Sequence, residues 1–336
     1  MYSLISKIVE FGVRIRNRKY ENGKNVVHSR LPVISVGNLS FGGTGKTPFV
    51  IMLADILMKM SRHPVIIGRG FNRQVKGNTI VSDGKQLLAD ISSAGDEMLM
   101  VAQSIPVPVL SCDSKSDAAL EAEKLFNVDT IIVDDAFQHR KLHRNLDIVL
   151  IDRETIDNPY LFPKGRLREP LSSLERADII CFNGDFQIDE TSSEFYPEKF
   201  KLKLEKKVLS INNLLNCIIY LPDKFPFIDY RFIAISGIAK PVNFILTLKS
   251  INFEISQHKI FADHYNYSRD DVRKIIDLCK DIRIKNIITT EKDAVKLANF
   301  KELFMSAGLN CFYIKIGLKI ESGNEKFMEK LSRIFN

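Results

Sequence analysis

The chain has 336 residues, of which 45% are apolar and 26% are charged, and it carries a net charge of +7. This length allows two ordinary domains or one large one. No apolar run reaches about 18 residues and the first residues do not read as a secretory signal, so the sequence predicts neither a membrane-spanning helix nor secretion. The five cysteines contain no C-x-x-C pair, which excludes a zinc knuckle of that type and favours a reducing cytosol.

The first predicted segment, residues 1–30, holds most of the excess charge, with seven basic residues against two acidic ones. The rest of the chain is nearly neutral, which argues against nucleic acid as a partner. Apolar residues recur at the spacing of one helical face, at Leu4, Ile5, Ile8, Phe11 and Ile15. Two interpretations are equally open: a basic amphipathic helix on an anionic membrane surface, and a helix that docks its stripe on the protein's own core. Because the stripe is short, membrane attachment through it alone would be weak.

The second segment, residues 31–200, alternates short apolar runs with helical patterns. Strands are expected at 32–37, 64–68, 106–111, 129–135, 146–152 and 177–183, and helices at about 46–60, 95–104 and 114–126. This alternation predicts an α/β fold with a mostly parallel sheet covered on both faces, whose ligands bind at the carboxyl ends of the strands.

Residues 201–229 are read as a linker or β-ribbon, after which the α/β pattern restarts. Strands are expected at 231–238, 254–261, 286–290 and 311–317, and helices at about 241–251, 269–281, 292–306 and 323–335. Residues 230–336 are therefore predicted to form a second, smaller α/β domain.

The motif VGNLSFGGTGKTP follows the first strand and opens the first helix of the sheet domain. It resembles the phosphate loop G-x-x-x-x-G-K-[ST], with Ser40 in place of the first glycine. Lys46 is expected to reach the β- and γ-phosphates and Thr47 to bind Mg²⁺. The alternative is a glycine-rich turn with a chance lysine. The candidate nucleotide contacts are Ser40, Phe41, Gly42, Gly43, Thr44, Gly45, Lys46 and Thr47.

A nucleotide loop of this kind needs an acidic partner at the end of a nearby strand. The run TIIVDD supplies Asp134 and Asp135, although acidic residues also cap strand ends without any function. The sequence does not decide which of these carboxylates binds the metal.

A kinase also needs a group that accepts the proton of the acceptor hydroxyl. Asp96 opens a predicted helix and is either such a base or an ordinary helix cap. His264, beside Asp263 at a strand end of the second domain, is either structural or a partner of Asp96 across a cleft. Lys292 either faces that cleft or belongs to a capping box between Thr290 and Asp293.

Two further clusters are candidates for charged chemistry. Arg166 and Arg168 in PKGRLREP can clamp phosphate, and Glu169 can assist the metal, unless the loop is simply solvated. His139 and His143 are four residues apart with no third ligand, so we expect no zinc site.

These pieces together resemble the tetraacyldisaccharide 4′-kinases of lipid A biosynthesis. The resemblance spans nearly the whole chain and is carried by VGNLSFGGTGKTP (36–48), GRGF (68–71), AGDE (94–97), VDDAFQHRKLHRNLDIVLID (133–152), GRLREP (165–170), FADHY (261–265) and TTEKDAVKL (289–297). It implies ATP-dependent phosphorylation of the 4′-hydroxyl of a tetraacyl glucosamine disaccharide 1-phosphate. It also implies two α/β domains joined by a β-ribbon, and a peripheral enzyme at the cytoplasmic face of the bacterial inner membrane, held there by the N-terminal helix.

The resemblance also assigns roles. Asp96 would act as the base with His264. Asp134, Asp135 and Glu169 would lie around Mg²⁺ and the nucleotide. Ser40 agrees with this family's own form of the loop. Gly68, Phe71 and Ala136 depart from residues common in the family and leave the catalytic set intact.

Two other classes of protein remain as alternatives. A cytosolic phosphate-loop ligase acting on a small acid would not need the basic arm. A nucleotide-switched membrane or metallochaperone module would need a Cys or His metal pair that the sequence lacks.

Overall fold

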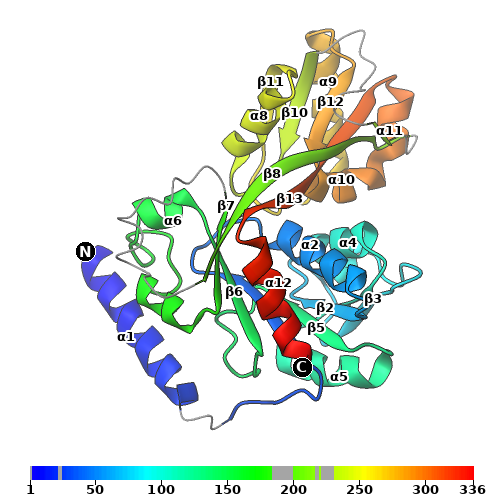
Figure 1. The fold of residues 1–336 in the computed structure, drawn as a ribbon. Helices are drawn as coiled ribbons and strands as arrows, with labels where there is room; N and C mark the ends of the chain where they lie inside the picture. Colours follow the sequence, from blue (N-terminus) through cyan, green and yellow to red (C-terminus); the bar gives the residue numbers. More distant parts are fainter. Residues whose placement is uncertain (1, 22–24, 184–199, 216–218, 221–230) are drawn as a thin grey trace. The chain divides into compact units, whose positions relative to one another are not determined.

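The computed structural model describes residues 2–21, 25–183, 200–215, 219–220 and 231–336 (Figure 1). These residues form two compact units. Unit 1 comprises residues 1–70, 74–206 and 318–336, and unit 2 comprises residues 71–73 and 207–317. The predicted α/β fold class is confirmed, with a mostly parallel sheet in each unit.

The sheet of unit 1 is parallel except at one edge. Its strands, in hydrogen-bonded order, are β8 (Phe200–Asn213), β7 (Ile179–Asn183), β6 (Leu146–Ile151), β1 (Val33–Asn38), β5 (Thr130–Asp134), β2 (Pro64–Gly68), β4 (Pro108–Ser111) and β3 (Thr79–Asp83). β3 was not predicted; it pairs antiparallel with β4 at the edge and is half-buried. β8, from the stretch predicted as a linker or ribbon, pairs parallel with β7. Because β1 lies between β5 and β6, the loop after β1 emerges beside the end of β5, where Val36 pairs with Asp134.

Helices cover the sheet of unit 1 on both faces. They are α2 (Lys46–Lys59), α3 (Ile91–Ala94), α4 (Asp96–Ser104), α5 (Lys115–Leu125), α6 (Arg153–Asp157) and the 3₁₀ segment η1 (Leu171–Arg176). The alanines of α5 pack against Val33 and Val65 on one face. The alternate residues Ile34 and Ile66, which point to the other face, are also fully buried.

Unit 2 contains a parallel sheet in the order β11 (Glu254–Ile260), β10 (Arg231–Ser236), β12 (Asn286–Thr290) and β13 (Asn310–Ser322). Its helices are α8 (Pro241–Ser250), α9 (Arg269–Asp281), α10 (Glu291–Leu297) and α11 (Lys301–Ser306), with η3 (Ala298–Phe300) between the last two. Val272 of α9 packs with Ile233 on one face of β10, and Phe244 of α8 packs with Phe232 on the other. The sheet is therefore sandwiched between helices.

The end of the chain returns to unit 1. β13 continues past Gly317, and α12 (Asn324–Ser332) and η4 (Arg333–Phe335) follow it. Phe327 of α12 is fully buried, with its ring 6.4 Å from that of Phe49 in α2. The second domain was expected to extend to residue 336, and the structure instead assigns residues 318–336 to unit 1 because of this packing.

The region expected to link the domains is only partly described. β8 runs from unit 1 into unit 2 and pairs at its end with β9 (Ile219–Tyr220). Residues 216–218 and 221–229 of the expected ribbon lie outside the described residues.

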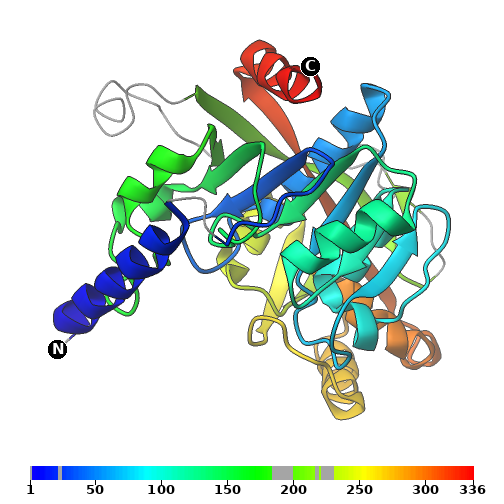
Figure 2. The ribbon, with the colours of Figure 1, turned by 90° about the horizontal axis from the view of Figure 1, so that it is seen from below.

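The N-terminal arm is a helix, α1 (Tyr2–Glu21). Figures 1 and 2 both show it, in dark blue, beside the segment that follows β6. Ser6 donates a hydrogen bond to the Leu161 carbonyl at 3.1 Å, and Arg140 donates one to the Asn17 carbonyl at 2.8 Å. Val13 is 8% exposed, so Ser6, Val13 and Asn17 lie on the side of α1 that contacts unit 1.

Candidate active site

The loop between β1 and α2 has the backbone of a phosphate loop. Gly42 (φ 102°) and Gly45 (φ 90°) are both left-handed, a conformation that glycine adopts without strain. Gly45 is the cap of α2, and a Cβ atom there would overlap the Asn183 amide, which donates to the Thr44 carbonyl at 2.8 Å. The loop is thus fixed from β7 just before the helix N-terminus, whose free N–H groups and dipole favour phosphate.

The GRLREP segment holds the upstream arm of this loop in place. The Phe41 N–H donates to the Arg166 carbonyl at 2.8 Å, and the Arg168 N–H donates to the Leu39 carbonyl at 2.6 Å. The Arg166 guanidinium donates to the Phe41 carbonyl and to Glu154. Arg166 therefore braces the loop with its own charge already paired, which differs from the predicted clamp on phosphate.

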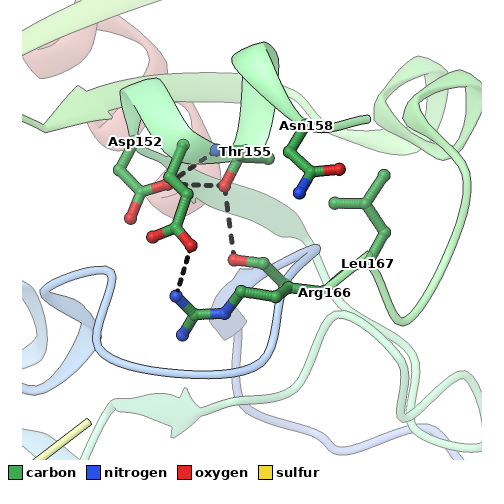
Figure 3. A pocket seen from close by; sticks show the side chains of 7 residues that line it. Asp152, Thr155, Asn158, Arg166 and Leu167 are labelled. Atoms are coloured by element: carbon green, nitrogen blue, oxygen red, sulfur yellow. Dashed lines mark hydrogen bonds and ion pairs between the residues drawn. The ribbon is translucent and has the colours of Figure 1, made fainter. Parts of the chain in front are cut away.

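Ser40 is fixed by α6. Its hydroxyl lies 3.3 Å from that of Thr155, which donates to the N-cap residue Asp152 (Figure 3). The pocket in Figure 3 lies here, with Asn158 and Leu167 in its lining. Its cavity volume is about 10 Å³, which leaves room for about one water molecule. The pocket belongs to the support of the loop and is too small to hold a nucleotide.

Asp135 lies among cations just after β5. Lys46 Nζ is 3.5 Å from its carboxylate, and one guanidinium nitrogen of Arg168 contacts both of its oxygens at 2.8–2.9 Å. Burial alone would raise the pKa of Asp135, but the charges on Lys46, Arg168 and Lys115 hold that pKa well below its usual range. Asp135 is therefore ionised, and its backbone is left-handed (φ 50°).

Asp134 has the opposite electrostatic character. It is 4% exposed, and its Oδ1 has no hydrogen-bond partner among the described residues. Burial and the nearby Glu97 raise its pKa to about 7, against the attraction of Lys46. An unsatisfied buried carboxylate oxygen beside a phosphate loop is a strong candidate for a cation ligand.

These residues fit a magnesium ion bound together with a nucleotide. Mg²⁺ prefers oxygen ligands and is usually held by one or two carboxylates plus substrate phosphates. Asp134 Oδ1 supplies one such oxygen, and the Thr47 hydroxyl stands in the first turn of α2. Among the described residues no three His, Cys, Asp or Glu side chains form a metal cluster.

Asp96 lies in the same unit as this site. It is 2% exposed and is the first residue of α4, while the cap position belongs to Gly95. Its Oδ1 accepts a hydrogen bond from the Glu97 N–H at 2.9 Å. Since the Glu97 charge acts on Asp134, the start of α4 lies close to the candidate metal ligand.

Glu169 lies between two arginines. The side chain is fully buried, and its two oxygens accept from different arginines, Arg16 of α1 and Arg176 of η1. With a guanidinium on each oxygen, Glu169 connects α1 to the body of unit 1, and the role near the metal expected of it stays a prediction.

His264 lies in unit 2, within a small charged cluster. Its Nε2 is 2.8 Å from Lys292 Nζ and 4.0 Å from the Asp263 carboxylate, and Lys292 is 3.6 Å from the same carboxylate. Since a lysine ammonium only donates, Nε2 accepts, and a neutral ring here carries its proton on Nδ1. The Phe71 ring contacts the imidazole at 3.9 Å between centroids, and Asn72 donates to the His264 carbonyl.

The structure thus brings together part of the predicted set. Lys46 and Arg168 both contact the Asp135 carboxylate. Asp134 precedes Asp135 in the chain, and the Glu97 charge at the start of α4 acts on it. The predicted pair of Asp96 and His264 is divided between the two units, so it stays a prediction.

Sequence reasoning missed one charged residue of this site, Lys115. Its Nζ donates to the Asp135 carbonyl, and the side chain is 8% exposed. The only signal in the sequence was a lysine directly after Ser114, a helix cap that gives no hint of burial.

Comparisons with known proteins agree with this arrangement. A family model described as Tetraacyldisaccharide-1-P 4′-kinase matches residues 1–336. A protein of Chlorobium phaeovibrioides named Tetraacyldisaccharide 4′-kinase is 34% identical over 307 residues, covering 88% of this chain and 86% of that protein. One of the same name from Halothermothrix orenii is 35% identical over 342 residues, covering 95% and 88% respectively.

A solved structure is also similar along the whole chain. It is a crystal structure of LpxK from Aquifex aeolicus in complex with ATP, with a TM-score of 0.76 and 30% identity. The match covers 99% of this chain and 98% of that one.

Proposed function

Because the chain belongs to the tetraacyldisaccharide-1-P 4′-kinase family, it phosphorylates the 4′-hydroxyl of a tetraacyldisaccharide 1-phosphate with ATP in lipid A biosynthesis, and we propose here the residues that do so. The observation that carries the proposal is that the carboxyl ends of β1 and β5 lie side by side. β1 leads into the glycine loop and Lys46, while β5 leads into Asp134 and Asp135, with Lys46 3.5 Å from Asp135.

The chain's own groups can hold a triphosphate in this place. The loop from Ser40 to Thr47 offers backbone N–H groups, and Lys46 and Arg168 exchange part of their contact with Asp135 for phosphate oxygens. Thr47 and Asp134 hold Mg²⁺, with Asp135 in support. When bound, Mg²⁺ neutralises charge on the β- and γ-phosphates.

Asp96 is the group proposed to take the proton of the 4′-hydroxyl. It is buried at the N-terminus of α4, with one oxygen engaged by the Glu97 N–H. A carboxylate in this position can accept a proton as the hydroxyl oxygen attacks phosphorus. We assign His264, supported by Lys292 and Asp263, as its partner from unit 2.

The substrate is a lipid, and α1 supplies a surface suited to a membrane. Ile8, Phe11 and Ile15 are 64%, 66% and 54% exposed, while Val13 on the other side of the helix is 8% exposed. The apolar stripe therefore points away from unit 1, which favours membrane contact over the alternative of core docking. Arg14, Arg18 and Lys19 are exposed on the same helix and suit anionic headgroups.

We further propose that the enzyme is peripheral and works at the cytoplasmic face of the bacterial inner membrane. No helix within the described part of the chain is long and apolar enough to cross a membrane. In this proposal unit 1 binds the nucleotide and the membrane, and His264 belongs to unit 2.

The test of the reaction uses a tetraacyl disaccharide 1-phosphate in mixed micelles, with ATP and Mg²⁺. Mass spectrometry should find one added phosphoryl group, and nuclear magnetic resonance should locate it on the 4′-oxygen. Lys46→Ala serves as the inactive control. Failure of the unaltered enzyme to form the 4′-phosphate would refute the proposed function.

A further inference from the structure

Lys115 is a buried cation that has no part in the reaction as described so far. It is the first residue of α5, directly after the cap residue Ser114, and it is 8% exposed. Lysine is almost never buried to this degree unless its ammonium group is paired. Burial lowers the pKa of Lys115, because it disfavours the charged form of the ammonium group. A compensating interaction is therefore required.

The compensating interaction is with the turn that follows β5. Lys115 Nζ donates a hydrogen bond to the backbone carbonyl of Asp135, and the carboxylates of Asp134 and Asp135 attract its charge. Asp135 itself is left-handed at φ 50°, a conformation that costs free energy for a residue with a Cβ atom. The ammonium thus binds the backbone at the one strained residue of this turn.

Lys115 and Lys46 reach the turn in different ways. Lys46, from α2, lies against the Asp135 side chain at 3.5 Å, where phosphate oxygens can compete for it. Lys115, from α5, binds the Asp135 main chain. It can therefore hold the turn whether or not a nucleotide is bound.

We propose that Lys115 is a positioning residue for the magnesium–nucleotide site. Lys115 holds the Asp134–Asp135 turn in place, so that both carboxylates keep their orientation. The inference rests on the proposed function of this site and adds a residue to it. Groups that orient a metal ligand from behind typically change metal affinity by roughly ten- to a hundredfold when removed.

The experiment compares Lys115→Met, which keeps the length of the side chain without its charge, with Lys115→Arg and the unaltered enzyme. Lys124→Met, at an exposed position of the same helix, is the matched control. Binding of a fluorescent ATP analogue is measured as a function of Mg²⁺ without any lipid acceptor, and thermal unfolding is measured without nucleotide. We expect the half-saturating Mg²⁺ concentration to rise by at least about tenfold in Lys115→Met. The half-saturating Mg²⁺ concentration of Lys115→Arg should stay close to that of the unaltered enzyme, and that of Lys124→Met should not change.

If Lys115→Met does not fold, Lys115→Gln, which keeps a donor without the charge, replaces it in the same titration. A lowered melting temperature with an unchanged Mg²⁺ requirement would reduce Lys115 to a structural role and overturn the inference. If the unaltered enzyme and all variants bind the nucleotide with the same Mg²⁺ requirement, the inference about Lys115 is overturned, but the proposed function is not. Absence of magnesium-dependent binding in the unaltered enzyme would overturn the proposed function as well.

Discussion

Adjacent carboxylates at the end of β5 are held in different states by their surroundings. Asp135 faces Lys46 and Arg168 and stays ionised, whereas burial and Glu97 raise the pKa of Asp134 to about 7. Each added positive charge near Asp134 therefore favours its ionised form, and a bound metal ion is such a charge. Asp135 thus neutralises the charges of Lys46 and Arg168, and Asp134 is suited to bind a cation.

His139 gives a prediction about stability and pH. Burial, with the positive charges of Lys115 and Arg144, lowers its pKa to about 4, and its Nε2 has no partner among the described side chains. The unfolded chain binds a proton near pH 6.5, but the folded chain does so only near pH 4. The contribution of His139 to the free energy of unfolding should therefore be complete above pH 6.5 and fall as the pH drops toward 4.

Chemical denaturation at several pH values checks this prediction. His139→Asn should flatten the stability profile between pH 6.5 and 4. An identical slope in His139→Asn and the unaltered protein would show that His139 is not the group responsible.

At the residue scale the sequence predicted identities better than contacts. The phosphate loop, Asp134 and Asp135 follow strands, so their position at the strand ends could be predicted. The pairing of Glu169 with Arg16 could not be predicted, because those residues are 153 positions apart. The sequence also did not predict where α1 lies on the protein. Ala136 departs from the residue common in the family, and the left-handed residue of this turn is Asp135, so alanine fits at 136.

Among the elements, α1 carries the clearest functional prediction. Replacing Ile8, Phe11 and Ile15 together by serine should weaken binding to anionic vesicles by at least about tenfold, because roughly 25 cal/mol is lost for each Å² of apolar surface no longer buried. The melting temperature should hardly change, since all three side chains are more than half exposed in the protein alone.

Vesicle co-sedimentation measures this loss, with Val242→Ser and Leu246→Ser combined as the control. Those residues are 66% and 58% exposed on α8, so the control removes comparable apolar surface from another helix. Equal binding by the α1 variant and the control would contradict a membrane role for this face.

Most elements could be predicted because their periodicity is strong. The core strands are continuous apolar runs of the kind buried in parallel sheets, and α9 has a clear apolar face. β3 was missed because an edge strand is half-buried and short. The predicted helix at 292–306 is divided into α10, η3 and α11, and no glycine or proline in that stretch marks the division.

For the whole molecule, the return of the chain to unit 1 has a consequence for stability. Phe327 is fully buried against Phe49, so Phe327→Ala should destabilise unit 1 by about 3–5 kcal/mol. Hydrogen exchange should accelerate in β1 and β5 and stay unchanged in β10 and β12. Met305→Ala, at an exposed side chain, is the control. Faster exchange in unit 2 instead would contradict the assignment of residues 318–336 to unit 1.

The sequence could not predict this return. A helix at 323–335 was expected, but its apolar face fits either sheet, and the packing partner is not encoded by periodicity. The relation of Asp96 to His264 is a similar case, because it depends on two units whose patterns are independent.

The central claim is that Asp96 takes the proton of the 4′-hydroxyl while other groups bind the nucleotide. A base acts in the transition state, so Asp96→Asn should lower single-turnover phosphoryl transfer by at least about a hundredfold. The affinity for Mg–ATP should stay within a few-fold of that of the unaltered enzyme. Rapid-quench measurement with the tetraacyl disaccharide 1-phosphate tests this directly. Transfer by Asp96→Asn at the rate of the unaltered enzyme would contradict the account.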